Sequence, residues 1–385
     1  MDIFVITIYL LLFGISVCTM NSRKYRKISV LIFLIFVSRG LLIIPSSAYF
    51  VKTVHLSFLY LVVFLLTNTT VVVKCLKQYS LCRKLIAVCF FFITSILFSI
   101  FYYNFTFVSV FVQGMRFMLL LSIFIYFTLN RDDVLWIMNA LFYITLITSL
   151  LYIIQGISNL PLLPYDLRRP TSPMFYGIYR YYNIPIYASF FLYISIFANY
   201  AIPKKLHTIS IYIFMAVTFI SLGRTAIFTM FFTIMLISYF QRKVKLYIYL
   251  AILMLPLSLV FGSFISDRMD SEGKSNDDMN AVLKLDYDAA ANHSENGLTM
   301  IYRLAWVNER IEYLAHRPFV EQLYGLGLPN DEDPDVYRKY NFRYGLHTKE
   351  GLTVQLRTPD IAWGNFVTCY GLLGTIIYFI FLTQL

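Results

Sequence analysis

Charge is scarce in this sequence, and apolar residues arranged in long runs take its place. Only 14% of the 385 residues are charged, whereas 59% are hydrophobic, a balance that excludes an ordinary soluble globular domain. Apolar runs of about 20 residues recur along the chain, and such runs are typical of transmembrane helices. The sequence therefore predicts an all-α polytopic membrane protein.

Cysteine is rare, and the familiar catalytic motifs are missing. The five cysteines are scattered, and none lies in the long polar interval at residues 266–360, so we expect neither a disulfide framework nor a Cys/His metal site there. The sequence contains no HExxH, GxSxG, P-loop or Rossmann glycine pattern. The acidic run Asp331–Asp335 lacks the spacing of a calcium-binding loop and favours a solvated turn. We therefore expect no metal and no cofactor.

The formal net charge of +11 does not indicate a nucleic-acid partner, because the positive charge is not gathered on the polar interval. Residues 266–360 hold 11 Lys or Arg against 17 Asp or Glu. The excess positive charge lies elsewhere, mostly in short connections between apolar runs, and short loops of this kind stay in the cytoplasm. The expected surroundings are membrane lipids, with no nucleic acid.

The apolar run Leu206–Phe240 decides the predicted topology. Its 35 residues are too many for one span and few for two. A break at Ser221–Arg224, favoured by Gly223, makes two short helices and keeps every basic loop inside. This arrangement predicts about 11 spans, with the N-terminus outside and the C-terminus inside. The predicted parts are a membrane domain at 1–265 with an external loop at 156–182, a large external loop at 266–360, and a final span at 361–385.

Within the large loop, Gly297–Arg317 has the period of an amphipathic helix, with apolar residues at spacings of three and four. These residues are Met300, Leu304, Val307, Ile311 and Leu314. Arg303, Arg310 and Arg317 are seven residues apart and should share a neighbouring flank of the helix. That flank is either an anion-binding surface near the membrane or a solvated surface, on which Glu309 and Glu312 pair with the arginines.

Further basic residues lie at predicted membrane depth or near the external surface. Arg116 lies nine residues into its span, and no Asp or Glu lies deep in another span to pair with it, so a lipid phosphate or a bound substrate would supply the anion. The external surface gathers Arg168, Arg169, Arg180, Arg224 and Arg303. Arginine donates paired hydrogen bonds to phosphate, and several arginines together would suit a diphosphate. Asp360, directly before the last span, is either a first-turn helix cap or a general base.

Three short motifs follow one another along the chain. They are Ser221-Leu-Gly-Arg224, the stretch from Arg303 and Trp306 through His316-Arg-Pro318 to Gly325-Leu-Gly327, and Asp360 followed by Tyr370-Gly371-Leu-Leu-Gly374. Their order and the predicted topology resemble the O-antigen polymerase and ligase superfamily of bacterial envelope glycosyltransferases. The architecture that carries this resemblance covers nearly the whole chain.

The resemblance implies glycosyl transfer on the outer face of a bacterial inner membrane. An acceptor hydroxyl would attack the anomeric carbon of a glycan on undecaprenyl diphosphate, and undecaprenyl diphosphate would leave, stabilised by arginine charge in place of a metal. The implied catalytic residues are Asp360 and Arg303. The substrate-binding residues are Arg224, Arg180, Arg169 and His316, with Arg116 added from its depth in the membrane.

Ligases of this superfamily usually carry histidine where this chain has Asp360, which favours a polymerase over a ligase. The product would be O-antigen, capsule or exopolysaccharide, and a flippase and a chain-length regulator would be partner proteins. A transporter for lipid-linked oligosaccharides is the main alternative, although transporters usually show inverted repeats with matching broken helices. A peptidoglycan glycosyltransferase of the shape, elongation, division and sporulation type matches in topology only, and a structural scaffold would not explain the arginines at membrane depth.

Overall fold

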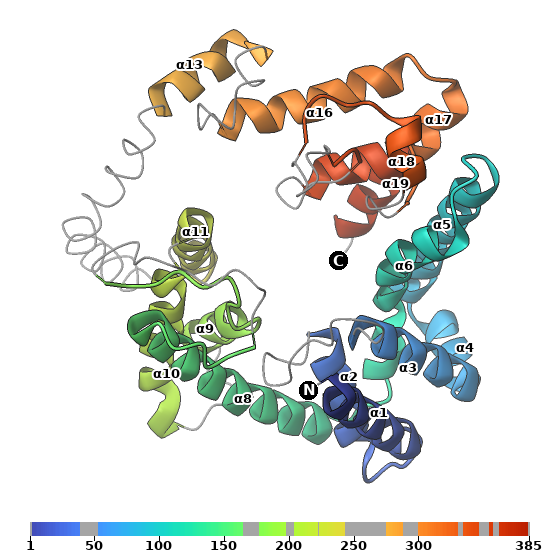
Figure 1. Cartoon of the computed structure of the whole chain (residues 1–385). Coiled ribbons are helices and arrows are strands. Elements are labelled where there is room, and N and C mark those ends of the chain that lie inside the picture. The colour runs from blue at the N-terminus through green and yellow to red at the C-terminus, as the bar shows by residue number, and fades with distance from the viewer. Residues whose placement is uncertain are drawn as a thin grey trace. The chain divides into compact units, whose positions relative to one another are not determined.

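The structure is a computed structural model of the chain. It describes residues 2–38, 53–164, 177–197, 204–221, 223–242, 275–287, 299–329, 334–345, 354–356 and 362–383. In these ranges, each regular secondary-structure element longer than one residue is a helix (Figure 1). The predicted all-α class is therefore confirmed. The chain forms two compact units, the first made of Met1–Val71 and Phe124–Val260 and the second of Val72–Ile123 and Phe261–Leu385.

Four helices are long and apolar enough to cross a membrane, and they mark the chain as a membrane protein. They are α5 (Ser80–Phe101), Phe107–Tyr126, α8 (Arg131–Ser158) and most of α19 (Ala362–Leu382). The bent pair α3 (Thr53–Thr67) and α4 (Thr69–Gln78) would make a fifth. Other apolar helices in the described ranges are shorter, so the predicted count of about 11 spans is not confirmed and stays a prediction.

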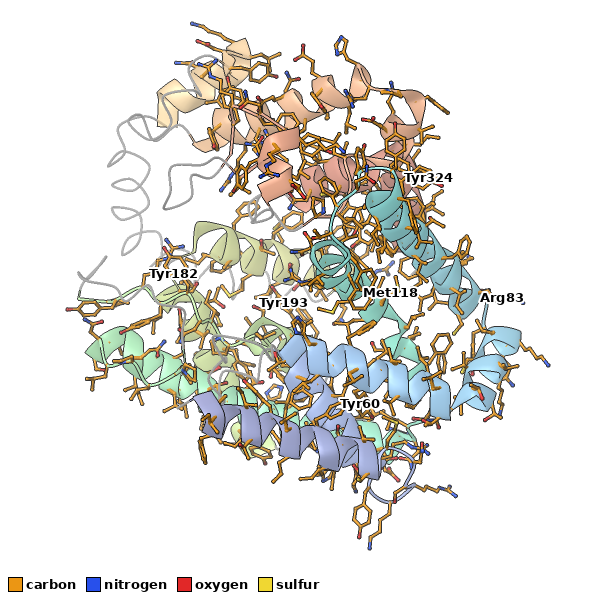
Figure 2. The ribbon with its side chains drawn as sticks, turned by 45° about the vertical axis from the view of Figure 1, so that its right-hand side comes forward. Tyr60, Arg83, Met118, Tyr182, Tyr193 and Tyr324 are labelled. Atoms are coloured by element: carbon orange, nitrogen blue, oxygen red, sulfur yellow. The ribbon has the colours of Figure 1, made fainter. Side chains whose placement is uncertain are left out.

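The first unit is a helix bundle held together by apolar packing and by a few buried hydrogen bonds between hydroxyl groups. Helices α1 (Asp2–Thr19), α2 (Arg26–Val37) and α3 share a core that includes Tyr9, Phe36 and Leu56. Ser29 Oγ contacts Tyr60 OH at 2.7 Å inside this bundle (Tyr60 is labelled in Figure 2). Helix α2 also packs on α8, which packs on α9 (Ala188–Phe197) and α10 (Lys204–Ile220). Hydroxyl bonds between apolar helices help to fix which helices pair inside a membrane.

The ends of α8 show why this helix begins and ends where it does. Asn130 caps the N-terminus, since its Oδ1 accepts a hydrogen bond from the backbone N–H of Asp133 at 2.7 Å. Asp132 and Asp133 in the first turn face the positive end of the helix dipole. Asn159 ends the helix in the left-handed conformation, with φ 55°.

The predicted break in Leu206–Phe240 is confirmed, because α10 ends at Ile220 and α11 (Arg224–Phe240) begins three residues after Ser221. The sequence places a short basic connection between two apolar runs at Lys74–Lys84, but these residues are not a loop. They belong to α4 and to the start of α5, and only Tyr79 between them is extended. Lysine and arginine are good helix formers, so the helices continue through the basic residues on both sides of Tyr79.

The second unit joins α5 and α6 (Phe107–Met118) to helices from the C-terminal part of the chain. These are α13 (Ser275–Lys284), α16 (Thr299–Ala315), α17 (Phe319–Tyr324), α18 (Pro334–Lys339) and α19. Gly114 of α6 lies so close to α5 that a Cβ there would overlap the side chain of Ile96. Helix α19 packs on α5, and α17 lies against α19 (Figure 1).

Candidate functional site

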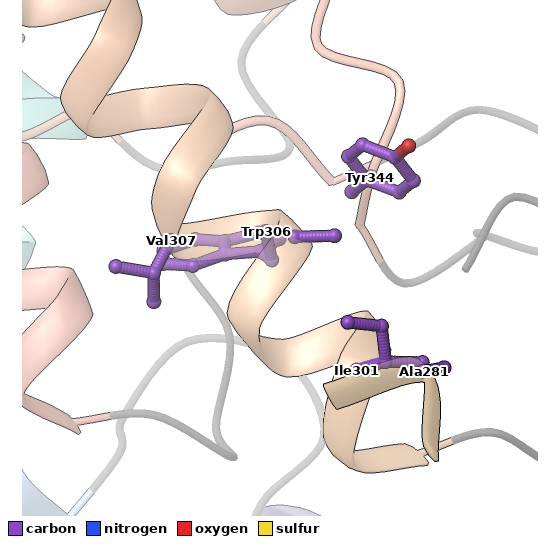
Figure 3. Close-up of a cluster of buried hydrophobic side chains, with 6 residues drawn as sticks. Ala281, Ile301, Trp306, Val307 and Tyr344 are labelled. Atoms are coloured by element: carbon purple, nitrogen blue, oxygen red, sulfur yellow. The ribbon is translucent and has the colours of Figure 1, made fainter. Parts of the chain in front are cut away.

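Helix α16 is the predicted amphipathic helix, and its bounds agree with Gly297–Arg317 to within two residues. Its buried face packs against Ala281 of α13 and Tyr344 (Figure 3). Trp306 is the largest side chain of this core and is almost fully buried. Ile311, predicted on the buried face, is 43% exposed. The period therefore predicts the helix, but among the described side chains Val307 alone of the predicted face lies in this core, and the other α16 residues in it are Ile301, Ala305 and Trp306.

The three arginines spaced seven apart do not share a surface, so the predicted flank is wrong in both of its interpretations. Arg303 is exposed, whereas Arg310 is 0% exposed. Arg317 lies beyond the end of α16 and pairs with Glu321 of α17. The backbone at Tyr344 and at Gln355 covers Arg310, and helix periodicity says nothing about these two distant positions.

Arg310 holds two segments of irregular backbone against α16. Its Nε and Nη2 donate to the carbonyl of Gln355 at 3.1 and 2.9 Å, and Nη1 donates to the carbonyl of Trp306 at 3.1 Å. The carbonyl of Tyr344 accepts a further bond from Nη2. The guanidinium lies over the rings of Trp306 and Phe342, at 4.2 and 4.5 Å from their centroids. Its donors are therefore used inside the protein, and Arg310 is not a substrate-binding residue in this structure.

Glu309 and Gln355 complete this clamp. The carboxylate of Glu309 accepts hydrogen bonds from Arg310 Nη1 at 2.8 Å and from the backbone N–H groups of Arg343 and Tyr344. Gln355 Oε1 accepts from the N–H of Phe342 at 2.6 Å. One of the two interpretations of the sequence pairs Glu309 with an arginine at helical spacing on the surface. In the structure Glu309 pairs with its sequence neighbour Arg310 and with the backbone of Arg343 and Tyr344.

Gly325 and Gly371, which belong to the two glycine motifs of the C-terminal part, are in contact through their backbones. A Cβ on Gly325 would lie 2.5 Å from the backbone nitrogen of Gly371, and one on Gly371 would collide with the carbonyl of Leu323. Both glycines have positive φ, 76° and 64°, which favours glycine at each position. Leu326 N–H donates to the carbonyl of Thr368 at 2.8 Å. Gly371 also interrupts the helical backbone of α19.

A polar cluster that the sequence did not predict joins α17 to the end of α5. Arg317 donates to both carboxylate oxygens of Glu321, at 2.7 and 3.1 Å, and this hydrogen bonding raises the pKa of Arg317. Tyr102 OH donates to Glu321 Oε1 at 3.1 Å. Lys339 Nζ donates to the carbonyl of Tyr103 at 3.1 Å, and burial lowers the pKa of Lys339. The i,i+4 spacing of Arg317 and Glu321 was the one signal of this cluster in the sequence.

In the first unit, the structure brings the chain around Arg180 close to the break before α11. A Cβ on Gly156, near the end of α8, would overlap the side chain of Ile220 at 2.6 Å and would lie 3.6 Å from the carbonyl of Tyr179. The neighbouring guanidinium of Arg180 lies 4.9 Å from the ring centroid of Tyr182. The end of α10 and the Tyr179–Arg180 backbone therefore adjoin the same turn of α8.

Buried side-chain hydrogen bonds hold the segment around Arg180 in place. Gln155 Nε2 donates to Asn183 Oδ1 at 2.8 Å, and Gln155 Oε1 accepts from the N–H of Leu163 at 3.1 Å. Tyr152 OH donates to the carbonyl of Tyr181 at 2.9 Å. Buried polar groups that are satisfied in this way fix a loop with precision, so the backbone of Arg180 is fixed from both sides.

Helix α11 begins with a positively charged residue, at the N-terminal end where the helix dipole is positive. Arg224 is its first residue, Gly223 is the cap, and no side chain caps the helix. No acidic residue lies in the first turn. The free N–H groups of a helix N-terminus and its dipole favour an anion, and Arg224 adds to that positive potential. The side chain of Arg224 lies outside the described residues.

The other predicted site residues are dispersed. Arg116 is exposed in the last turn of α6, directly before a 3-10 segment at Leu119–Ser122. His316 lies at the C-terminal end of α16, where Nδ1 is 2.8 Å from the carbonyl of Glu312. It is 13 residues from Arg303, about 20 Å along a helix axis and on nearly the opposite side, so these two do not form one site. Arg169 and Asp360 lie outside the described residues.

Within the described ranges, no group of three or more His, Cys, Asp or Glu is placed to hold a metal ion. Comparisons of the chain with protein-family models, with curated proteins and with solved structures give no match. The function therefore has to be argued from the arginines, the glycine contact and the membrane spans.

Proposed function

We propose that this protein is a membrane glycosyltransferase that polymerises undecaprenyl-diphosphate-linked repeat units into surface polysaccharide. Arg224 at the first position of α11 carries the proposal. A cation at the positive end of a helix dipole is unfavourable by up to about 1 kcal/mol. A bound diphosphate would reverse the sign of that contribution, because helix N-termini with free N–H groups bind phosphate well.

Arg180 supports the same anion site. Its backbone adjoins the turn of α8 that also contacts the end of α10, directly before the break. Two guanidinium groups with the N–H groups of α11 would match the several acceptor oxygens of a diphosphate. As the leaving group departs, its growing negative charge would be stabilised by groups already in place. We therefore expect no metal requirement.

Arg303 is proposed as a further diphosphate contact, and Asp360 as the residue on the acceptor side. Arg303 is exposed on α16, and α16 is fixed by its own core and by the Arg310 clamp. Asp360 precedes α19 and would act as general base toward the acceptor hydroxyl. Arg169, Arg116 and His316 remain proposed substrate contacts, with Arg116 as the deepest. In this proposal the chain lies in the inner membrane with about 11 spans and its 266–360 loop outside.

The test is polysaccharide chain length on a gel, in a deletion strain complemented with variants. We expect wild type to restore long chains, and Arg224→Ala, Arg303→Ala and Asp360→Ala to leave single repeat units. The loss of one arginine from the anion site should lower the rate by about 10²- to 10³-fold. Arg338→Ala is the matched control, because Arg338 is an exposed arginine of α18 that pairs only at 3.4 Å with Asp335.

Other outcomes identify the alternatives. Lipid-linked repeat units that accumulate inside, with no surface glycan, would indicate a flippase or another transporter. Long lipid-linked chains that never reach their acceptor would indicate a ligase. A deletion strain that still makes long chains would exclude the polymerase.

A further inference from the structure

The short helix α17 contacts the candidate span α5 at residues well before the end of that span at Phe101. Tyr324, the last residue of α17, stacks on Phe98 and Phe91 of α5, with ring centroids 4.9 and 5.9 Å apart. Those residues lie three and ten positions before the end of α5 at Phe101. At a rise of about 1.5 Å per residue, they lie about 5 and 15 Å below that end. Figure 2 shows Tyr324 at the end of α5 that is farther from Arg83.

Contacts with a second candidate span, in α19, independently place the turn after α17 at a similar depth. Gly325 is in backbone contact with Gly371, and Leu326 is hydrogen-bonded to Thr368. Gly371 and Thr368 lie eight and five residues after Trp363, where the candidate span in α19 begins, so the contact is about 8–12 Å along that span. Hydrocarbon cores are about 30 Å thick. Helix α17 and the turn after it therefore lie beside two spans at the depth of one lipid leaflet.

The backbone of this turn meets the condition for irregular structure inside a bilayer, which is that its polar groups find partners within the protein. Tyr103 OH donates to the carbonyl of Gly325 at 2.8 Å, and Tyr340 OH donates to the carbonyl of Leu326 at 2.8 Å. Leu328 N–H donates to Ser99 Oγ at 3.1 Å. Residues 325–329 are all buried. Three backbone groups of the turn are thus paired with hydroxyl groups of neighbouring residues, in addition to the Leu326 N–H that is bonded to Thr368.

The outer face of α17 is apolar. Phe319 and Val320 at its start are 70% and 45% exposed, while Glu321 points inward to Arg317 and Tyr102. Tyr102 directly follows Phe101, which is 76% exposed at the end of a candidate span. Apolar side chains exposed at the end of a span face the membrane interface. The same lipid layer would cover Phe319 and Val320.

We propose that α17 and the Gly325–Pro329 turn form a re-entrant element, which enters the leaflet on the Phe101 side of α5 and places Phe319 and Val320 against lipid acyl chains. Arg317 and Glu321 pair on either side of Phe319 and Val320, so the charge of Glu321 is compensated within the protein while the two apolar side chains stay exposed. This proposal concerns the membrane as partner and does not depend on the proposed glycosyl transfer.

The test measures the depth of α17 in a bilayer directly. Single cysteines replace Phe319, Val320 or, as the control, Glu312, which is exposed on α16. The background is Cys18→Ser, since Cys18 is exposed and the other four cysteines are buried. Each variant carries an environment-sensitive fluorophore and is reconstituted in phosphatidylcholine and phosphatidylglycerol vesicles. The quenchers are aqueous iodide, lipids with a nitroxide on the head group, and lipids with a nitroxide on the acyl chain.

For Phe319→Cys and Val320→Cys we expect loss of most of the fluorescence with the acyl-chain nitroxide and little loss with iodide, and the reverse for Glu312→Cys. Strong quenching of both α17 positions by iodide would overturn the proposal. Quenching by the head-group nitroxide alone would also overturn it, because α17 would then rest on the surface. Protection from all three quenchers would overturn it too, since protein would cover the face. Two positions are used so that one misfolded variant does not leave the proposal untested.

Discussion

At the scale of single residues, position on a helix wheel did not decide the role of a side chain. Arg303 and Arg310 occupy equivalent heptad positions, yet one is exposed and the other is completely buried. The difference comes from the segment that folds over Arg310 and supplies the carbonyls of Gln355 and Tyr344. Sequence patterns within a helix carry no information about such distant backbone acceptors, so the error was unavoidable from periodicity alone.

Arg310→Ala should destabilise the second unit strongly. The change would leave the buried carbonyls of Gln355 and Tyr344 without this donor and would remove one of the donors to the Glu309 carboxylate. Removing one partner of a buried charged network costs about 3–5 kcal/mol. Arg303→Ala is the control on the same helix and should change stability by less than about 0.5 kcal/mol. The measurement is the midpoint of thermal unfolding of the purified protein in detergent. Equal midpoints for the two variants would contradict the clamp.

At the scale of elements, the structure explains why two separate glycine motifs occur together. Gly325 ends α17 and Gly371 interrupts α19, and their backbones touch. Both glycines belong to the motifs that carry the family resemblance, and the sequence does not predict that one contacts the other. That pairing depends on α17, a helix of six residues, which is too short to leave a periodic signal. The Arg317–Glu321 spacing was visible, whereas its contact with Tyr102 was not.

Gly371→Ala should prevent the docking of α17 on α19. The new methyl group would meet backbone atoms, which cannot rotate away, in addition to the cost of positive φ. Gly177→Ala separates the two effects, because Gly177 has φ 77° but has no heavy atom within 4 Å of the added Cβ. It should lose only about 1–2 kcal/mol. The amount of folded protein after detergent extraction is the measurement, and equal yields for the two variants would show that the close contact is not required.

At the scale of the whole molecule, hydropathy indicates that the chain has apolar helices, but it does not say which of them pack together. Residues 72–123 form one compact unit with 261–385, although the predicted membrane domain joined them to the rest of 1–265. Lipid chains are as apolar as leucine, so apolarity does not select partners among spans. Which helices pack together is decided by close contacts, such as that of Gly114 with Ile96, and by hydrogen bonds, such as that from the Tyr103 hydroxyl to the Gly325 carbonyl. These are specific pairs that composition does not reveal.

The topology rests on whether α10 and α11 cross the membrane separately. Each has 17 residues, about 26 Å of helix against a hydrocarbon core of about 30 Å, so two short spans in a thinned bilayer are feasible. If they formed one broken span, the basic residues after Phe240 would face outward and the large C-terminal region would lie in the cytoplasm. Two spans keep the basic segments inside, as the positive-inside rule requires.

Cysteine accessibility decides between these topologies. In the Cys18→Ser background, Glu312→Cys reports the side of α16 and Lys77→Cys reports the side of α4, both at exposed positions. With a membrane-impermeant maleimide on spheroplasts, we expect Glu312→Cys to be labelled at once and Lys77→Cys only after lysis. Labelling of neither position before lysis would place α16 inside. Arg224 would then lie within a broken span and Arg303 on the cytoplasmic side, and polymerisation on the outer face would be excluded.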